Sequence, residues 1–133
     1  MVLLCACHES DNEQILDQLD QVIESKGLYA VRFERRVDSL RRELCTASDD
    51  TMRWRTANRL FDSYITYNID TAARYVALMY DLAEHTGRRD MKFLSTTCDI
   101  SVLIGRNNIE DAYDRIRSLD TAGITKRMRA NYY

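Results

Sequence analysis

The densest group of metal-ligand residues in the sequence is the run CACH at positions 5–8. Zinc takes four ligands at the corners of a tetrahedron, and a C-x-C-H run is too compressed to supply all four. A further ligand would have to come from Cys45, Cys98 or His85. A short apolar N-terminal arm that happens to carry thiols explains the same residues. We therefore expect no metal and no cofactor.

Residues that could catalyse a reaction do not occur at the spacings that catalysis requires. His85 follows Glu84 near the end of a predicted helix, where the helix dipole favours a histidine. The sequence contains no H-E-x-x-H, no G-x-S-x-G and no phosphate-binding glycine loop. The many carboxylates fall on solvated helix faces. We therefore predict that the protein is not an enzyme.

The charge balance does not favour a nucleic-acid partner. The formal net charge is −2, so no global positive field would attract phosphates. The most basic segment, residues 32–42, alternates arginines with acidic residues at spacings that let them pair along a helix. We interpret this segment as a solvated helix face and expect no nucleic acid to bind.

The composition predicts a single helical domain. The chain has 133 residues, 45% hydrophobic and 30% charged, with no Pro and four Gly. We predict one domain over 1–133, with a short arm at 1–9. Four scattered cysteines do not resemble a disulfide framework, which favours an intracellular protein. No apolar run is long enough to span a membrane, and the last residues, RMRANYY, offer no anchor.

Apolar residues recur at helical spacing along almost the whole chain, and we detect no internal repeat. The first helix is predicted over 11–26, from an S-x-x-E capping box at Ser10 and Glu13 to a stop at Gly27. Asp49 suits an N-cap, and so does either Asn68 or Asp70. Further helices are predicted over 31–46, after Asp49–Asp50, over 70–86 and 88–104, after Asn107–Asn108, and over 124–131.

The helix predicted at about Arg88 to Ile104 is apolar on more than one side, which is typical of a buried central helix. Its Thr and Ile content would also suit a strand, but no partner strand is evident. No heptad is sustained, so a coiled coil is not expected. We predict an all-α globular bundle in which amphipathic helices surround this segment.

Two motifs at helix junctions resemble the Bcl-2 family of apoptosis regulators. The segment LMYDLAEHTGRRDMKFL is similar to the family's first homology motif, with Gly87 and Arg88 at its Gly-Arg pair. Upstream, SLRRELCTASDD resembles the third homology motif (BH3), with Leu44 as its leucine and Asp49 as its acid. The first helix, ending in ESKGLYA, resembles the fourth motif. A chain without the second motif or an anchor is most similar to the virus-encoded members.

The resemblance implies a Bcl-2-like fold and an anti-apoptotic function. Such a protein would sequester the BH3 helix of a selective subset of pro-apoptotic proteins in a hydrophobic groove. It would act in the host cytoplasm, with recruitment to mitochondria through its partners, and a homodimer could cover the free groove. Arg88 would meet the BH3 acid. The groove residues would be Leu60, Phe61, Tyr64, Val76, Met79, Tyr80, Gly87 and Arg88, each with a core position as the alternative.

Two other interpretations stay open. Some viral relatives of this fold bind immune signalling adaptors through outer helix faces and not through the groove. The chain could also be an unrelated helical module that binds nucleic acid or metal. For the Gly-Arg pair itself, the plain structural alternative is that Gly87 ends a helix and Arg88 is a solvated first-turn residue.

Overall fold

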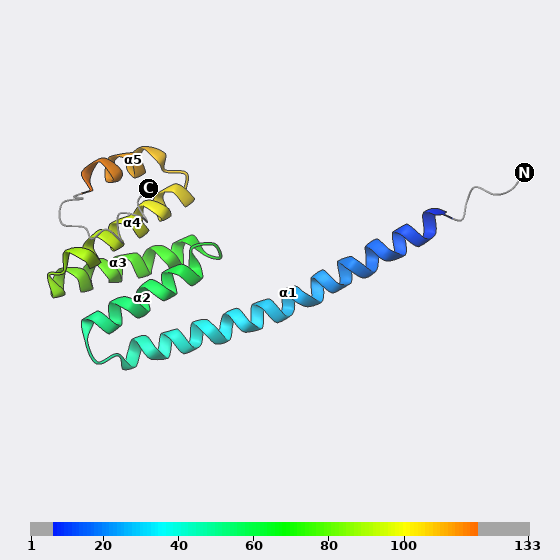
Figure 1. Cartoon of the computed structure of the whole chain (residues 1–133), viewed down its shortest axis with the longest axis horizontal. Coiled ribbons are helices and arrows are strands. Elements are labelled where there is room, and N and C mark those ends of the chain that lie inside the picture. Colours follow the sequence, from blue (N-terminus) through cyan, green and yellow to red (C-terminus); the bar gives the residue numbers. More distant parts are fainter. Residues whose placement is uncertain (1–6, 120–133) are drawn as a thin grey trace, which may run out of the picture. The chain divides into compact units, whose positions relative to one another are not determined.

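A computed structural model describes residues 7–119, and their side chains from Asn12 onward, as five helices joined by turns (Figure 1). No strand occurs in this range, so the prediction of an all-α fold is confirmed. The helix predicted over 124–131 lies outside the described residues. The chain divides into two compact units between Arg36 and Val37, and each is described by itself.

The first unit consists of the larger part of one long helix, α1 (Cys7–Thr46). The sequence predicted two helices here, separated at Gly27, and a start at Ser10. Both boundaries are wrong, since α1 begins at Cys7 and continues through Gly27. A glycine inside a helix costs only about 1 kcal/mol relative to alanine, which a long helix tolerates.

The second unit contains the last turns of α1 (37–46) and four more helices: α2 (Asp50–Tyr64), α3 (Ile69–Thr86), α4 (Arg89–Gly105) and α5 (Ile109–Ser118). α2 packs on α3, α3 on α4, and α4 on α5 (Figure 1). Because the connecting turns are only a few residues long, successive helices run back along each other. Among the described helices, none has the combined length and apolarity that crossing a membrane requires.

Three helix ends are formed by the residues that the sequence predicted. The Asp49 side chain accepts a hydrogen bond from the backbone N–H of Met52 at 2.8 Å and caps α2. The Asn68 side-chain oxygen accepts a hydrogen bond from the backbone N–H of Thr71 at 2.9 Å and caps α3. Gly87 ends α3 in the left-handed conformation, with φ of 63°, which glycine adopts without a Cβ clash.

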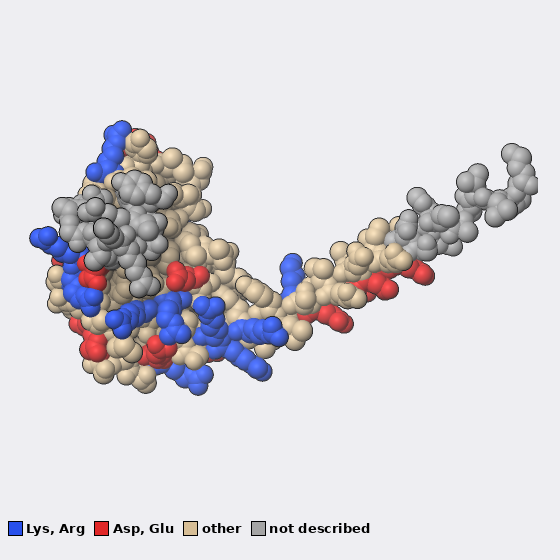
Figure 2. Space-filling model, in the orientation of Figure 1, with Lys and Arg blue, Asp and Glu red and all other residues tan. Residues whose placement is uncertain are grey.

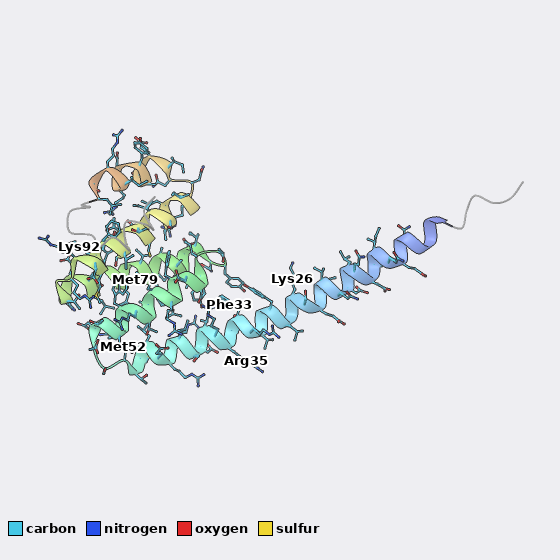
Figure 3. All side chains as sticks on the ribbon, viewed as in Figure 1. Lys26, Phe33, Arg35, Met52, Met79 and Lys92 are labelled. Carbon is cyan, nitrogen blue, oxygen red and sulfur yellow. The ribbon has the colours of Figure 1, made fainter. Side chains whose placement is uncertain are left out.

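The core of the second unit is built from the apolar stripes that these helices turn toward one another. Met79 of α3, at its centre, has no exposed surface (Figure 3). The other buried hydrophobic residues are Val37, Leu40, Trp54, Ala57, Leu60, Phe61, Tyr64, Ala72, Val76, Leu82, Ala83, Met91, Phe93, Ile100, Val102 and Ala112. α4 is helical, as predicted, but it is not surrounded, since Lys92, Ser101 and Ile104 are exposed.

Candidate functional site

The apolar residues predicted to line a groove lie mainly inside the core. Leu60 and Met79 are completely buried, and so, to within a few per cent, are the other members on α2 and α3: Phe61, Tyr64 and Val76. Tyr64 also stacks on Tyr75, with ring centroids 5.8 Å apart, and accepts a hydrogen bond from Arg41 at 2.8 Å. These side chains join α2 to α3 and leave no open groove between them.

Tyr80, the remaining aromatic residue of the predicted groove, is half-buried on α3. Its hydroxyl is buried and has no hydrogen-bond partner among the residues that the structure describes. Burial raises the pKa of Tyr80 above its ordinary value, because a phenolate would lose its hydration there. The residue is therefore a packed side chain whose polar end is enclosed, which differs from an exposed groove wall.

The Gly-Arg pair at the start of α4 has a local structural explanation. Arg88 is exposed and forms a bidentate pair with Asp90, in which Nε lies 3.0 Å from one carboxylate oxygen and Nη2 lies 2.5 Å from the other. The guanidinium holds the pKa of Asp90 below its usual range. Asp90 is also favoured in the first turn by the helix dipole. The carboxylate that Arg88 contacts therefore belongs to its own helix.

The thiol and histidine residues of the second unit do not form a metal centre. Within the described range, no group of three His, Cys, Asp or Glu residues is placed to hold an ion. Cys45 and Cys98 are free thiols, and His85 lies 3.9 Å from Asp50. The run CACH lies outside the residues whose side chains are described, so the expectation that it binds no metal stays a prediction.

A hollow of about 460 Å³ lies between α4 and α5. Three of its six lining residues are aspartates, and the lining residue Arg115 is paired with Asp99 at 3.2 Å. The lining residues are Asp99, Leu103, Asp111, Asp114, Arg115 and Ser118. None of these residues belongs to the apolar groove that the sequence predicted, so the hollow lies elsewhere.

Two side-chain contacts join α2 to α4, although α3 separates them in the sequence. The indole N–H of Trp54 on α2 donates to the Ser95 hydroxyl on α4 at 3.1 Å, and both side chains are buried. Nearby, the Cys98 thiol donates to the Asn58 side-chain oxygen at 3.6 Å. Burial, and then the charge of Asp62, raise the pKa of Cys98 to about 12. Alternate helices of the chain are thus in direct contact.

The other side of α2 contacts the last turns of α1. The Glu43 carboxylate accepts hydrogen bonds from Thr56 at 3.1 Å and from Arg59 at 2.9 Å. α2 therefore meets α1, α3 and α4 at once.

A few residues of the sequence recur at an interval of forty positions. Thr46 and Thr86, at the ends of α1 and α3, each donate to a backbone carbonyl four residues earlier. The hairpins α2–α3 and α4–α5 also carry identical residues forty positions apart: Asp50 and Asp90, Asn68 and Asn108, Ile69 and Ile109, Ala72 and Ala112. The prediction that the chain has no internal repeat is wrong.

A family model described as the SusR N-terminal TPR domain matches residues 23–133, which is more than half of the chain. The chain belongs to this TPR family. No curated protein and no solved structure matches it. A tetratricopeptide repeat (TPR) is a pair of helices that stacks on the next pair, so that corresponding helices of successive repeats become neighbours. The contacts between α2 and α4 follow from this architecture.

The TPR family overturns the resemblance to Bcl-2 proteins. The fold is a TPR-like helical domain and not a Bcl-2-like bundle, and the functions inferred from that bundle, BH3 binding and inhibition of host cell death, are withdrawn with it. So is the alternative of a viral Bcl-2-fold immunomodulator. The two motifs that suggested the family are helix junctions, at 46–50 and 86–90. Helix stops and caps need similar residues in unrelated folds. TPR domains are protein-interaction modules.

Sequence reasoning missed the residues that join α2 to α4. On either side of these contacts, the two helices present a surface that we name the α2–α4 face. It is made of exposed or half-exposed residues at spacings of three and four: Arg55, Asn58 and Asp62 on α2, and Cys98 and Ser101 on α4. The forty-residue recurrence was the signal that could have placed the two helices together.

Proposed function

We propose that this TPR domain binds a protein partner through the α2–α4 face. One observation carries the proposal, namely the buried hydrogen bond between Trp54 and Ser95. Because it fixes two helices that are not consecutive, the residues beside it form one continuous surface and not two independent helix faces. A rigid surface of this kind loses little conformational freedom on binding.

The chemistry of the face favours a partner segment with both polar and charged groups. Arg55 is exposed and has no hydrogen bond or ion pair with any residue of the described range. Its guanidinium is therefore available to a carboxylate of the partner, which it could bind through two parallel hydrogen bonds. The side chains of Asn58 and Ser101, on the same face, would add hydrogen bonds to polar groups of the partner.

The test is to select binders of the full chain from a display library of short random peptides and to measure the affinities of the enriched sequences. Arg55→Glu should weaken them by about tenfold or more, as expected when a charge-assisted hydrogen bond becomes a repulsion. Arg74→Glu is the matched control, because Arg74 is exposed on α3 and makes no ion pair with the residues described.

Enrichment of acidic peptides whose binding depends on Arg55 and not on Arg74 would support the proposal. Equal effects of both substitutions, or of neither, would place binding elsewhere on the domain and contradict it. The absence of any enriched peptide, with the helical fold intact by circular dichroism, would contradict it too. The prediction that the protein is not an enzyme remains compatible with this function.

A further inference from the structure

The first unit carries an apolar stripe that the structure leaves exposed. Five large side chains on α1 each have more than half of their surface exposed: Ile15, Leu16, Leu19, Val22 and Ile23. Their spacing of i, i+1, i+4, i+7 and i+8 places them on one face of the helix. A lone helix cannot bury its own apolar stripe. Because helices in proteins gain most of their stability when such a stripe packs against another element, we expect this stripe to be covered.

The spacing of the stripe is that of a pairing seam between two helices. Leu16, Leu19, Ile23, Lys26 and Ala30 follow one another at intervals of three, four, three and four residues. This alternation keeps a seam facing a partner helix over about two heptads, which suits a short helix pair and not the sustained coiled coil that the sequence excludes. A polar residue at one seam position, here Lys26, is compatible with such pairing and tends to fix its register.

Charge divides this part of α1 into two segments of opposite sign. Residues 12–25 carry four carboxylates and no base, namely Glu13, Asp17, Asp20 and Glu24. Residues 26–36 carry four bases and one acid, namely Lys26, Arg32, Arg35, Arg36 and Glu34. The space-filling view shows the acidic stretch of α1 followed by the basic one (Figure 2), and Lys26 and Arg35 mark the basic stretch in Figure 3.

We propose that a second copy of the chain covers this stripe, with its α1 antiparallel to the first. In a parallel pair, each charged segment would lie beside a segment of its own sign. In an antiparallel pair, the acidic segment of each helix lies beside the basic segment of the other. The distance between the helices is comparable to the Debye length in physiological salt, so the opposite charges still attract each other. Charge complementarity therefore selects a second copy, and it selects the antiparallel orientation.

The register follows from the seam. With the twofold axis between positions 24 and 25, Leu19 faces Ala30 of the second copy, and Ile23 faces its Lys26. The small Ala30 then lies opposite the larger Leu19, and Leu16 faces position 33 of the second copy. The paired stretch, residues 12–36, would be about 37 Å long at 1.5 Å per residue.

The first test is sedimentation equilibrium of the full chain. We expect a monomer–dimer equilibrium whose dissociation constant rises at least tenfold in Leu19→Glu and also rises with ionic strength. Gln21→Glu adds the same charge on the opposite face of α1 and should leave the dissociation constant within about twofold. Circular dichroism checks that both variants keep their helix content, and neither should affect peptide binding at the α2–α4 face.

The second test determines the orientation. A spin label at Glu13→Cys, with the native cysteines replaced by Ser, reports the distance between the two copies of this position. The antiparallel register places position 13 opposite position 36, so the labels should be about 35 Å apart. A parallel pair would bring them to about 10–15 Å, given interaxial distances of 8–10 Å, and would overturn the proposal.

Two further outcomes would overturn it. A chain that stays monomeric at all accessible concentrations, with slow hydrogen exchange along 12–25, would mean that its own second unit covers the stripe. A monomer with fast exchange there would mean that nothing covers it. Since these results leave the α2–α4 face untouched, failure of this proposal is distinguishable from failure of the proposed function.

Discussion

The indole N–H of Trp54 donates a hydrogen bond to the hydroxyl of Ser95, 3.1 Å away and forty-one residues later in the chain. Ser95 donates its own hydroxyl proton to the carbonyl of Met91 at 2.8 Å. Every polar atom of this buried group is therefore satisfied, and α2 is joined to α4 without the participation of α3. This contact links one helical pair to the next, beside the packing of α3 on α4.

Replacing Ser95 by Ala should lower the free energy of unfolding by about 1–3 kcal/mol, because the buried indole N–H would be left without an acceptor. Urea denaturation measures the effect. Ser101→Ala is the matched control, since Ser101 lies on the same helix and donates to a carbonyl but is exposed. It should change stability by less than about 0.5 kcal/mol. Equal losses in both variants would contradict a special role for the contact.

Gly87 and Gly27 should respond in opposite ways to alanine. Gly87 ends α3 with φ of 63°, so a Cβ there should cost about 1–2 kcal/mol of unfolding free energy. Gly27 lies inside α1 with open space where a Cβ would be, so Gly27→Ala should leave the helix content by circular dichroism unchanged or higher. A loss of helix in Gly27→Ala would show that this glycine does interrupt α1.

Met79 should contribute far more to stability than Met52. Met79 is fully buried, whereas Met52 is 40% exposed at the start of α2 (Figure 3). Met79→Ala creates a cavity and should cost about 2–5 kcal/mol, measured by thermal or urea unfolding. Met52→Ala should cost less than about 1 kcal/mol. Comparable losses would mean that α3 does not lie in the centre of the core.

Cys98 should react slowly with alkylating agents at slightly alkaline pH. Burial raises its pKa to about 12, so almost no reactive thiolate forms, whereas Cys45 is exposed. Peptide mass spectrometry after iodoacetamide should show Cys45 modified at least about tenfold faster, with the difference lost in urea. Because the folded pKa lies above the unfolded one, the contribution of this thiol to stability is present below about pH 9 and is lost as the pH rises toward 12.

Local signals in the sequence predicted the ends of several helices but not their arrangement. Asp49, Asn68 and Gly87 act through hydrogen bonds and backbone angles within a few residues, so their roles can be read from the neighbouring sequence. The stop predicted at Gly27 is wrong, because a glycine ends a helix only where the chain needs a positive φ. The backbone at Gly27 keeps a negative φ, and residues 28–46 continue α1.

The arrangement of helices depends on contacts between distant residues, and here the prediction from sequence is wrong. Gly87 and Arg88 match a short motif, and a dipeptide at a helix junction carries little information about the fold. The recurrence of Asn68 and Ile69 at Asn108 and Ile109 is the stronger signal, since repeated residues at a constant interval predict repeated helix pairs. An apolar residue such as Met79 suits either the protein core or the wall of a binding groove. Only its burial in the folded structure shows that Met79 belongs to the core.

The most direct test of the repeat architecture uses the single tryptophan of the chain, whose indole N–H gives one unambiguous NMR signal. In a NOESY spectrum of the full chain, we predict cross-peaks from the Trp54 indole N–H to side-chain protons of Ser95 on α4, together with slow exchange of that proton. Cross-peaks to α1 or α3 alone, with rapid exchange, would contradict the packing of α2 against α4 and with it the α2–α4 face.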